Sequence, residues 1–240
     1  MLAIDAGNTR IKWGVHGDGR WLASGAILTA ESAGWGAAWQ AAPKPDRAIA
    51  SNVAGSQVLA DLERACKQAG VPLQVIRPVA SLLGVTNGYA DPGQLGSDRW
   101  ASLIAAHHLS RGHKLVVNVG TALTIDALTA EGQFLGGVIV PGPALMRRSL
   151  DRGTAGLRLT EGEFNDLPRS TPDAITSGAI AAGVGAITRL ADAMAKQGVA
   201  PANIILSGGA SGEISPHLPI PFAIHENLVL DGLVLIARNC

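Results

Sequence analysis

The stretch LAIDAGNTRIK at residues 2–12 decides the fold expected of this chain. Residues 2–5 form a short apolar segment that predicts a strand, residues 7–9 predict a turn, and residues 11–15 predict the returning strand. Glycine at such a turn lets the backbone come close to a ligand, and successive amides with a threonine hydroxyl supply donors to an anion. The sequence therefore predicts a β-hairpin whose tip can hold a phosphate group.

The same pattern returns in the second half of the chain. Residues 114–118 predict a strand, residues 119–121 a turn and residues 123–128 a returning strand, and residues 4–9 (IDAGNT) align with residues 117–122 (VNVGTA). A match that follows an apolar strand in both halves indicates an internal duplication. We therefore expect two related α/β lobes, at residues 1–113 and 114–240.

The rest of the chain alternates between strands and helices by periodicity. Further strands are expected at residues 21–28, 46–51, 72–76, 133–140 and 204–206, and helices at residues 35–41, 58–68, 99–109, 143–158, 171–196 and 227–237. Ser170 or Thr171 is the expected N-cap of the long helix. Residues 207–210 (SGGA) form a third glycine-rich turn after a strand, which could pass close under a nucleoside.

Composition narrows the classes of partner. Lys plus Arg equals Asp plus Glu at 19 each, so no long-range field attracts nucleic acid or an anionic membrane. Cys66 and Cys240 have no disulfide or zinc spacing, and the N-terminus lacks a signal-peptide pattern. No uninterrupted apolar run approaches the ~20 residues of a membrane span. These features predict a soluble cytoplasmic protein with neither nucleic acid nor membrane as its main partner.

Common catalytic motifs are missing. The sequence has no GxxxxGK[ST], no GxGxxG after a strand, and neither HExxH nor GxSxG, which excludes a P-loop and leaves metalloprotease and α/β-hydrolase chemistry without its site. Asp5, at the strand end before the first turn, could hold Mg²⁺ through water. The alternative is an ordinary hairpin with a capping aspartate, but two glycine turns of one kind suit a polyphosphate better.

The segment from Tyr89 to Trp100 (YADPGQLGSDRW) carries the most reactive side chains. Asp98 lies at the start of the helix expected from residue 99. One interpretation is that Ser97 or Asp98 is simply an N-cap. The other is that Asp98 accepts a proton from an alcohol that attacks a γ-phosphate, while Arg99 fixes a carboxylate or amide of the same substrate. Both can hold together.

Taken in order, these motifs resemble those of the type III pantothenate kinases, including the Bvg accessory factor-like branch. The series spans nearly the whole chain and is specific as a set: DAGNTRIK (residues 5–12), GSDR (96–99), NVGTALTID (118–126), FLGGVIVPG (134–142), STPDAITSG (170–178) and LSGG (206–209).

The resemblance implies a fold, an activity and a set of site residues. The implied fold is α/β and duplicated: an actin-like (acetate kinase, sugar kinase, Hsp70), ribonuclease H-like fold with two lobes around an ATP cleft. The implied activity is phosphorylation of pantothenate by ATP with Mg²⁺ to give 4'-phosphopantothenate, the first step of coenzyme A synthesis. The resemblance also implies a cytoplasmic homodimer in which part of the pantothenate pocket is supplied across the interface. The implied ATP-binding residues are Asp5, Ala6, Gly7, Asn8, Thr9, Arg10, Ile11, Lys12 and Thr121. Asp98 is the implied proton acceptor, and Tyr89, Gly96, Ser97, Asp98, Arg99 and Thr171 are the implied pantothenate-binding residues.

One position departs from the family pattern. Many members have aspartate at the first position of the second phosphate hairpin, where it ligates K⁺ or ammonium, and this chain has Asn118. An amide oxygen attracts a cation less strongly than a carboxylate does. K⁺ or NH₄⁺ therefore stays a possible cofactor, and Asn118 is not counted as a metal ligand.

Two alternatives to pantothenate kinase activity remain from the sequence. One is a regulatory or accessory protein that keeps the actin-like fold and acts by binding. The other is a kinase of a different small acceptor, such as a sugar or acetate. Asp5, Asp98 and Arg99 favour catalysis, because a pure binding module needs no base beside its ligand.

Overall fold

The computed structural model describes residues 1–153 and 161–239, and these form two compact units. The first unit contains Met1–Ser110 and the chain from Asn227 onward, and the second unit is Arg111–Glu226. The contacts thus group the last helix with the first unit, whereas the sequence-based division at residues 113 and 114 grouped it with the second.

The first unit is built on a five-stranded sheet in the order β3-β2-β1-β4-β5. Its strands are β1 (Leu2–Ala6), β2 (Arg10–Gly17), β3 (Arg20–Leu28), β4 (Ala48–Asn52) and β5 (Leu73–Val75). β1, β2 and β3 form an antiparallel meander, whereas β4 pairs in parallel with both β1 and β5. The glycine-bearing turn at residues 7–9 makes the first hairpin, as predicted.

The second unit repeats this sheet strand for strand. Its order is β10-β9-β8-β11-β12, with β8 (Lys114–Val119), β9 (Ala122–Leu128), β10 (Phe134–Pro141), β11 (Asn203–Ser207) and β12 (Phe222–Ile224). β8, β9 and β10 are antiparallel, and β8, β11 and β12 are parallel. Identical order and direction in both sheets confirm the predicted duplication.

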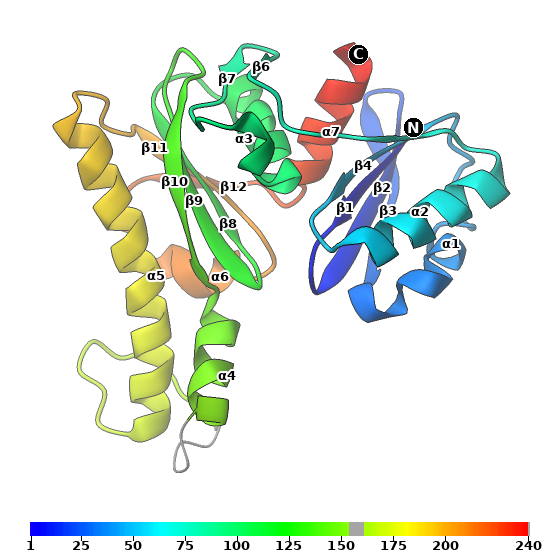
Figure 1. The fold of residues 1–240 in the computed structure, drawn as a ribbon. Helices are drawn as coiled ribbons and strands as arrows, with labels where there is room; N and C mark the ends of the chain where they lie inside the picture. Colours follow the sequence, from blue (N-terminus) through cyan, green and yellow to red (C-terminus); the bar gives the residue numbers. More distant parts are fainter. Residues whose placement is uncertain (154–160, 240) are drawn as a thin grey trace. The chain divides into compact units, whose positions relative to one another are not determined.

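Helices cover both faces of the first sheet (Figure 1). They are η1 (Thr29–Gly34), α1 (Trp35–Ala38), α2 (Ser56–Ala69), α3 (Ser97–Leu109) and α7 (Leu228–Asn239). Leu2, Ile4 and Ala6 alternate along β1 and join one apolar core with Trp35 and Leu62, which α1 and α2 supply. Since side chains alternate across a strand, Asp5 belongs to the opposite face, where α7 packs on β1 and β4 and α3 packs on β4.

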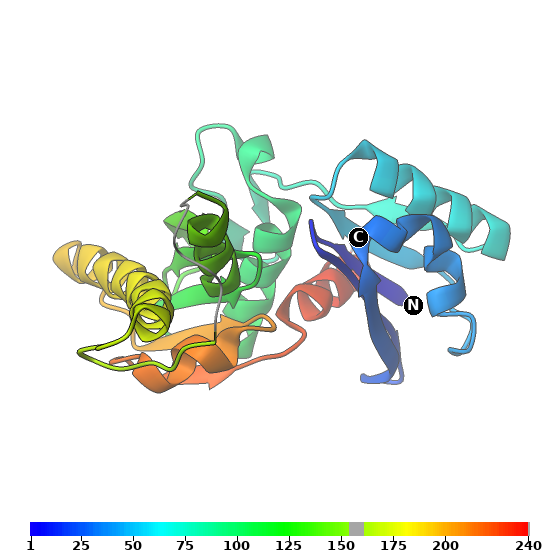
Figure 2. The same cartoon turned by 90° about the horizontal axis from the view of Figure 1, so that it is seen from below.

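The second unit has its own core and its own helices. These are α4 (Pro143–Gly153), α5 (Thr171–Lys196), α6 (Ser211–Ile214) and η3 (Ser215–His217). α5 begins at the predicted cap, where the Ser170 hydroxyl accepts the N–H of Asp173 at 3.2 Å. α4 and α5 lie side by side and extend beyond one end of the sheet (Figure 1 and Figure 2).

Some elements differ from those expected. The helix predicted at residues 35–41 begins earlier, as η1, and ends at Ala38, because Gly34 and Gly36 weaken a regular helix there. The short strands β6 (Ser81–Leu82) and β7 (Val85–Thr86), the turn η2 (Pro92–Gln94), β12, α6 and η3 were not expected, because segments this short carry little periodicity. The helix predicted at residues 143–158 is observed to Gly153, and its remainder lies outside the described residues.

α5 has the length and mean hydropathy of a membrane span, although polar residues such as Thr176, Ser177 and Arg189 interrupt its apolar run. Its 18-residue window has a mean hydropathy of 1.4, and 33% of that window is buried. Among the described residues, α5 is the only helix with both this length and this hydropathy. A single such helix is weak evidence for a span, because a packed helix of a globular unit has the same composition.

The crossing of α3 and α7 depends on a glycine. A Cβ placed on Gly232 of α7 would overlap the backbone of Ala101 in α3. Gly232 therefore lets the two helices approach closely, and this contact holds the end of the chain on the first unit.

We expect Gly232→Ala to lower the free energy of unfolding by roughly 2–4 kcal/mol, because the helices must separate or bend to admit the methyl group. Gly212→Ala is the matched control, since nothing lies within 4 Å of a Cβ at that helical position. Urea unfolding followed by circular dichroism measures both variants. Equal stability of the two would show that the crossing tolerates a side chain.

Candidate active site

The loop between β1 and β2 is held in a tight conformation by its own unit. The Gly7 N–H donates to the Arg10 carbonyl at 3.1 Å, and the Thr29 hydroxyl, just past the end of β3, donates to the Gly7 carbonyl at 2.6 Å. The Thr29 N–H donates to the Thr9 carbonyl at 3.0 Å. Asn8, Thr9 and Arg10 are exposed, so the tip of this loop is shaped in advance and available to a ligand.

The loop between β8 and β9 is held in the corresponding way. The Gly120 N–H donates to the Ala122 carbonyl at 3.0 Å, and Gly142, just past the end of β10, donates to the Thr121 carbonyl at 2.8 Å. A Cβ on Gly142 would overlap the Gly120 carbonyl. Gly120 and Thr121 are exposed. Each half therefore fixes its hairpin with the end of its third strand.

Asp5 lies in a row of polar side chains across three strands. Lys12 of β2 is its partner in the antiparallel pair, and Ser51 of β4 is its partner in the parallel pair. Directly paired residues project to the same face of a sheet. The row Lys12, Asp5 and Ser51 therefore occupies the face that α3 and α7 cover.

The pKa of the Asp5 carboxyl group is raised well above its ordinary value. Burial, and after it the negative charge of Asp98, raise its pKa from the ordinary 3.8 to about 7, and the positive charge of Lys12 opposes this rise. The interaction with Asp98 shows that the structure brings these two carboxyl groups, far apart in sequence, into one electrostatic environment. Two mutually repelling acids with one lysine form a site that attracts a further cation.

Asp98 stands in the first turn of α3, and its carboxylate folds back over the helix start. Oδ1 accepts the N–H of Arg99 at 2.8 Å, and a Cβ on Gly96 would approach this oxygen to 2.6 Å. Burial raises the pKa of Asp98, while the N–H and the charge of Arg99 oppose the rise. Ser97, the residue before it, turns inward, and its hydroxyl shares a 2.8 Å hydrogen bond with that of Ser51.

Arg99 and Tyr89 form a second polar group beside the start of α3. Arg99 is only 4% exposed, and its Nη1 donates to the Tyr89 hydroxyl at 3.0 Å, with the guanidinium carbon 5.7 Å from the ring centre. The Tyr89 N–H donates to Asn87 Oδ1, whose Nδ2 donates to the Pro92 carbonyl. The loop that carries Tyr89 is therefore ordered around this pair.

In the second unit, Asn118 occupies the position of Asp5. Its strand partners are Thr124 and Ser207, where Asp5 has Lys12 and Ser51. The duplicated row thus lacks both charges. The glycine-rich turn follows at Gly208, which has a φ of +100° and leaves no room for a Cβ against Val119. The backbone rather than a side chain defines this turn.

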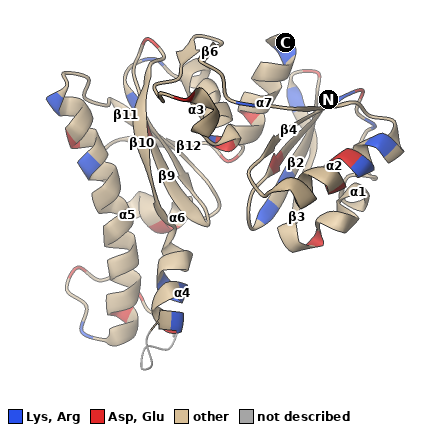
Figure 3. Ribbon diagram, in the orientation of Figure 1, with Lys and Arg blue, Asp and Glu red and all other residues tan. Residues whose placement is uncertain are grey.

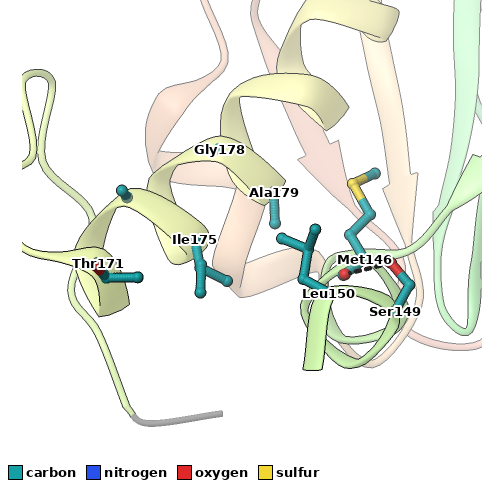
Figure 4. Close-up of a pocket in the computed structure, with 8 residues that line it drawn as sticks. Met146, Ser149, Leu150, Thr171, Ile175, Gly178 and Ala179 are labelled. Carbon is teal, nitrogen blue, oxygen red and sulfur yellow. Dashed lines mark hydrogen bonds between the residues drawn. The ribbon is translucent and has the colours of Figure 1, made fainter. Parts of the chain in front are cut away.

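Thr171 lines an apolar pocket of about 470 Å³ between α4 and α5. It is exposed at the start of α5, and Ile175, Ala179 and Gly178 follow along the same helix (Figure 4). Met146, Ser149 and Leu150 of α4 form the opposite wall, with Ala174 completing the lining. Of the predicted site residues, Thr121 and Thr171 belong to the second unit and the others to the first.

Sequence reasoning missed Ser51. A serine in an apolar strand has no motif around it, and only the pairing of β4 with β1 places it beside Asp5. Within the part of the chain that the structure describes, no three or more His, Cys, Asp or Glu side chains gather in a metal-binding arrangement.

Solved structures of sugar kinases resemble this fold. A ROK family glucokinase from Streptomyces griseus, solved with glucose and AMPPNP, superposes with a TM-score of 0.52 at 13% identity over 99% of both chains. An inorganic polyphosphate/ATP-glucomannokinase from Arthrobacter gives a TM-score of 0.51 at 16% identity over 100% of this chain and 99% of that one. The duplicated sheets and this likeness define the class: the chain has the actin-like fold of the sugar kinases, as predicted.

The sequence comparison identifies the family. The family model for type III pantothenate kinase matches residues 1–193. The type III pantothenate kinase of Aromatoleum aromaticum is 46% identical over 239 residues, covering 100% of this chain and 98% of that protein. The chain belongs to the type III pantothenate kinase family, and it is a kinase.

We expect Asp5→Asn to stabilise the ligand-free protein at pH 8. Because the folded-state pKa of Asp5 lies above its ordinary value, the folded chain holds this proton more tightly than the unfolded chain does. Wild-type stability therefore falls as pH rises from 3.8 to about 7. Asparagine removes that contribution, which is on the order of 1–4 kcal/mol.

Thermal unfolding from pH 4 to pH 8 measures this effect. The melting temperature of the variant should exceed that of wild type at pH 8 and approach it at pH 4. A variant that is less stable than wild type at pH 8 would mean that the charged carboxylate stabilises the fold.

Proposed function

We propose that this chain transfers the γ-phosphate of ATP to pantothenate and releases 4'-phosphopantothenate, the first step of coenzyme A synthesis. The single observation that carries the proposal is the pair Asp5 and Asp98, whose pKa values are both raised at one end of the first sheet. Membership of the family supports pantothenate as the phosphate acceptor, and the pair Asp5 and Asp98 supports phosphoryl transfer at this site.

Asp98 acts as the proton acceptor in this proposal. Phosphoryl transfer depends mainly on positioning and charge neutralisation, with an acid residue that orients the nucleophilic hydroxyl. The hydrogen bond from the Arg99 N–H and the space above Gly96 hold the carboxylate in one orientation. A raised pKa makes Asp98 a stronger base than an exposed aspartate.

The first hairpin binds phosphate in the same proposal. Residues 5–12 contribute the backbone of Ala6, Gly7 and Asn8, the Thr9 hydroxyl and the charge of Lys12. Asp5 fits a divalent cation, because its carboxylate oxygen is a hard donor and Asp98 adds a second negative charge to its surroundings. Mg²⁺ bound with ATP would supply charge neutralisation at the phosphates. Assignment of Thr121 to ATP remains a prediction from the family pattern.

Pantothenate carries a carboxylate, an amide and hydroxyl groups, and the loop before α3 offers partners for them. Arg99 and Tyr89 provide a guanidinium and a phenol that already contact each other, and the backbone around Gly96 and Ser97 is close to Asp98. We assign the carboxylate end of the substrate to Arg99 and its reacting hydroxyl to Asp98. Thr171 completes the pocket from a partner copy of the chain.

In this proposal, a monovalent cation binds near Asn118. The row around Asn118 offers neutral oxygens from Ser207 and Thr124, and the Thr124 hydroxyl is buried with no hydrogen-bond partner among the described residues. Neutral oxygens fit K⁺ or NH₄⁺ but bind them less tightly than a carboxylate does. We propose a low affinity for such an ion.

The second unit offers a surface for a homodimer. Small exposed residues recur at helical spacing along one face of α5, namely Ala174, Gly178, Ala181 and Gly185, and such residues allow close helix packing. Ala174 and Gly178 also line the pocket between α4 and α5. No charged residue lies between Asp173 and Arg189 (Figure 3). Val138 and Ile139 of the edge strand β10 are 39% and 60% exposed. We propose that this face pairs with a second copy.

The proposed location is the cytoplasm, where ATP and a reducing environment are present. Cys66 is buried, and burial raises the pKa of its thiol to about 11. A thiol with that pKa is largely unreactive at neutral pH, which suits a chain that forms no disulfide through it.

Asp98→Asn is expected to abolish turnover while the fold stays intact, because the amide cannot accept the proton of the pantothenate hydroxyl. We expect a loss of about 10²-fold or more in kcat. A coupled assay measures pantothenate-dependent release of ADP, and far-UV circular dichroism checks the fold. Near-wild-type phosphorylation by the variant would rule out Asp98 as the proton acceptor.

The same assay separates the alternatives. A regulatory protein of this fold would release no ADP in response to pantothenate. A kinase of another acceptor would release ADP with a sugar or acetate in place of pantothenate.

Ala181→Arg is expected to convert the dimer to a monomer, because a long charged side chain cannot enter a face packed by small residues. Light scattering coupled to gel filtration measures the mass. If Thr171 completes the pocket of the partner, kcat/KM for pantothenate should fall at least about tenfold, in proportion to the monomer fraction. Asp192→Arg, an exposed change about two turns beyond Gly185 on the same helix, is the control. A variant that remains dimeric would place the interface elsewhere.

A further inference from the structure

Ser51 is a fully buried hydroxyl at the centre of the first unit, and neither the family pattern nor the proposed chemistry assigns it a role. It is 0% exposed on β4, on the sheet face opposite to that of Ala48 and Ala50. Burial of a hydroxyl costs free energy unless it is hydrogen-bonded. Its hydroxyl is bonded to that of Ser97 at 2.8 Å.

This bond ties a strand to the start of a helix. Ser51 pairs directly with Asp5 across β4 and β1, and Ser97 is the first residue of α3. Gly96, the N-cap of α3, gives the helix no side-chain capping bond. The Ser51–Ser97 bond therefore ties the first turn of α3 to the sheet, whereas Asp98 binds an N–H of the helix itself and Arg99 binds Tyr89 of the preceding loop.

The position of the Asp98 carboxylate depends on the position of the first turn of α3. Its carboxylate is bonded to the Arg99 N–H and lies over Gly96, so it is fixed relative to the first turn rather than to the sheet. A displacement of the first turn would carry the carboxylate away from Asp5. Reactions that depend on positioning lose rate steeply with such displacements.

We propose that Ser51 is a positioning residue for phosphoryl transfer: through its hydrogen bond with Ser97 it sets where the Asp98 carboxylate stands relative to Asp5. This inference rests on the proposed role of Asp98. In this proposal Ser51 contacts neither the substrate nor the nucleotide. The Ser97 hydroxyl binds Ser51, whereas the Ser97 backbone lies beside the substrate.

The test is a double-mutant cycle of Ser51→Ala, Ser97→Ala and the double variant in the pantothenate-dependent ADP-release assay. We expect each single change to lower kcat about tenfold with little change in the KM for ATP. The double variant should be no slower than the slower single variant, because both changes remove one bond. Ser51→Thr, which keeps a hydroxyl, should recover much of the lost kcat.

A pH profile separates positioning from general structural damage. If Asp98 is displaced from Asp5, the acid limb of kcat/KM should move to lower pH in Ser51→Ala, since the charge of Asp98 then raises the pKa of Asp5 less. Ser32→Ala is the matched control. Ser32 is a buried serine of the same unit, and its hydroxyl donates to Asp61 at 2.7 Å, so its loss should lower the melting temperature without changing kcat or the pH profile.

Three outcomes would overturn the proposal. They are wild-type kcat in Ser51→Ala, effects of the two single changes that multiply in the double variant, or a shift of the acid limb in Ser32→Ala equal to that in Ser51→Ala. If Ser51→Ala fails to fold, the same cycle is measured with Ser51→Thr and Ser51→Cys, and equal kcat in both and in wild type counts against the role. Absence of pantothenate-dependent ADP release in wild type would instead refute the proposed function.

Discussion

The parallel pairing of β1 with β4 is the constraint on which the candidate site depends. It places Asp5 opposite Ser51, and the hydrogen bond from Ser51 to Ser97 then joins the helix that carries Asp98 to the same strand pair. The antiparallel pairing of β1 with β2 adds Lys12 on the other side. The strand pairings and the start of α3 thereby bring Asp5, Asp98 and Lys12 together, although the partial burial of these charged groups costs stability.

Duplication explains both the likeness and the difference of the two halves. Each sheet has the same strand order, and each hairpin is held by a hydrogen bond from just beyond its third strand, at Thr29 in one half and Gly142 in the other. The polar row has diverged, because Asn118 and Thr124 stand where Asp5 and Lys12 do. The charged side chains of this row therefore belong to the first unit alone.

Local patterns predicted the hairpins and most of the fold, since glycine turns and apolar alternation act over a few residues. They failed where a long-range contact decides the outcome. The segment at residues 227–237 was correctly expected to be helical, yet nothing in it indicates that Gly232 meets Ala101 and so groups it with the first unit. Asp98 was recognisable from its place at a helix start, whereas Ser51 becomes visible only through strand register.

Asp5 and Asp98 share one half-buried electrostatic environment. Carbon-13 NMR of aspartate carboxyl groups, titrated from pH 3 to pH 9 in wild type and in Asp98→Asn, tests this coupling. We expect a wild-type Asp5 resonance that titrates at about 7, and a lower midpoint once the charge of Asp98 is removed. An Asp5 carboxyl that titrates at its ordinary 3.8 in wild type, or a midpoint that does not move in the variant, would contradict it.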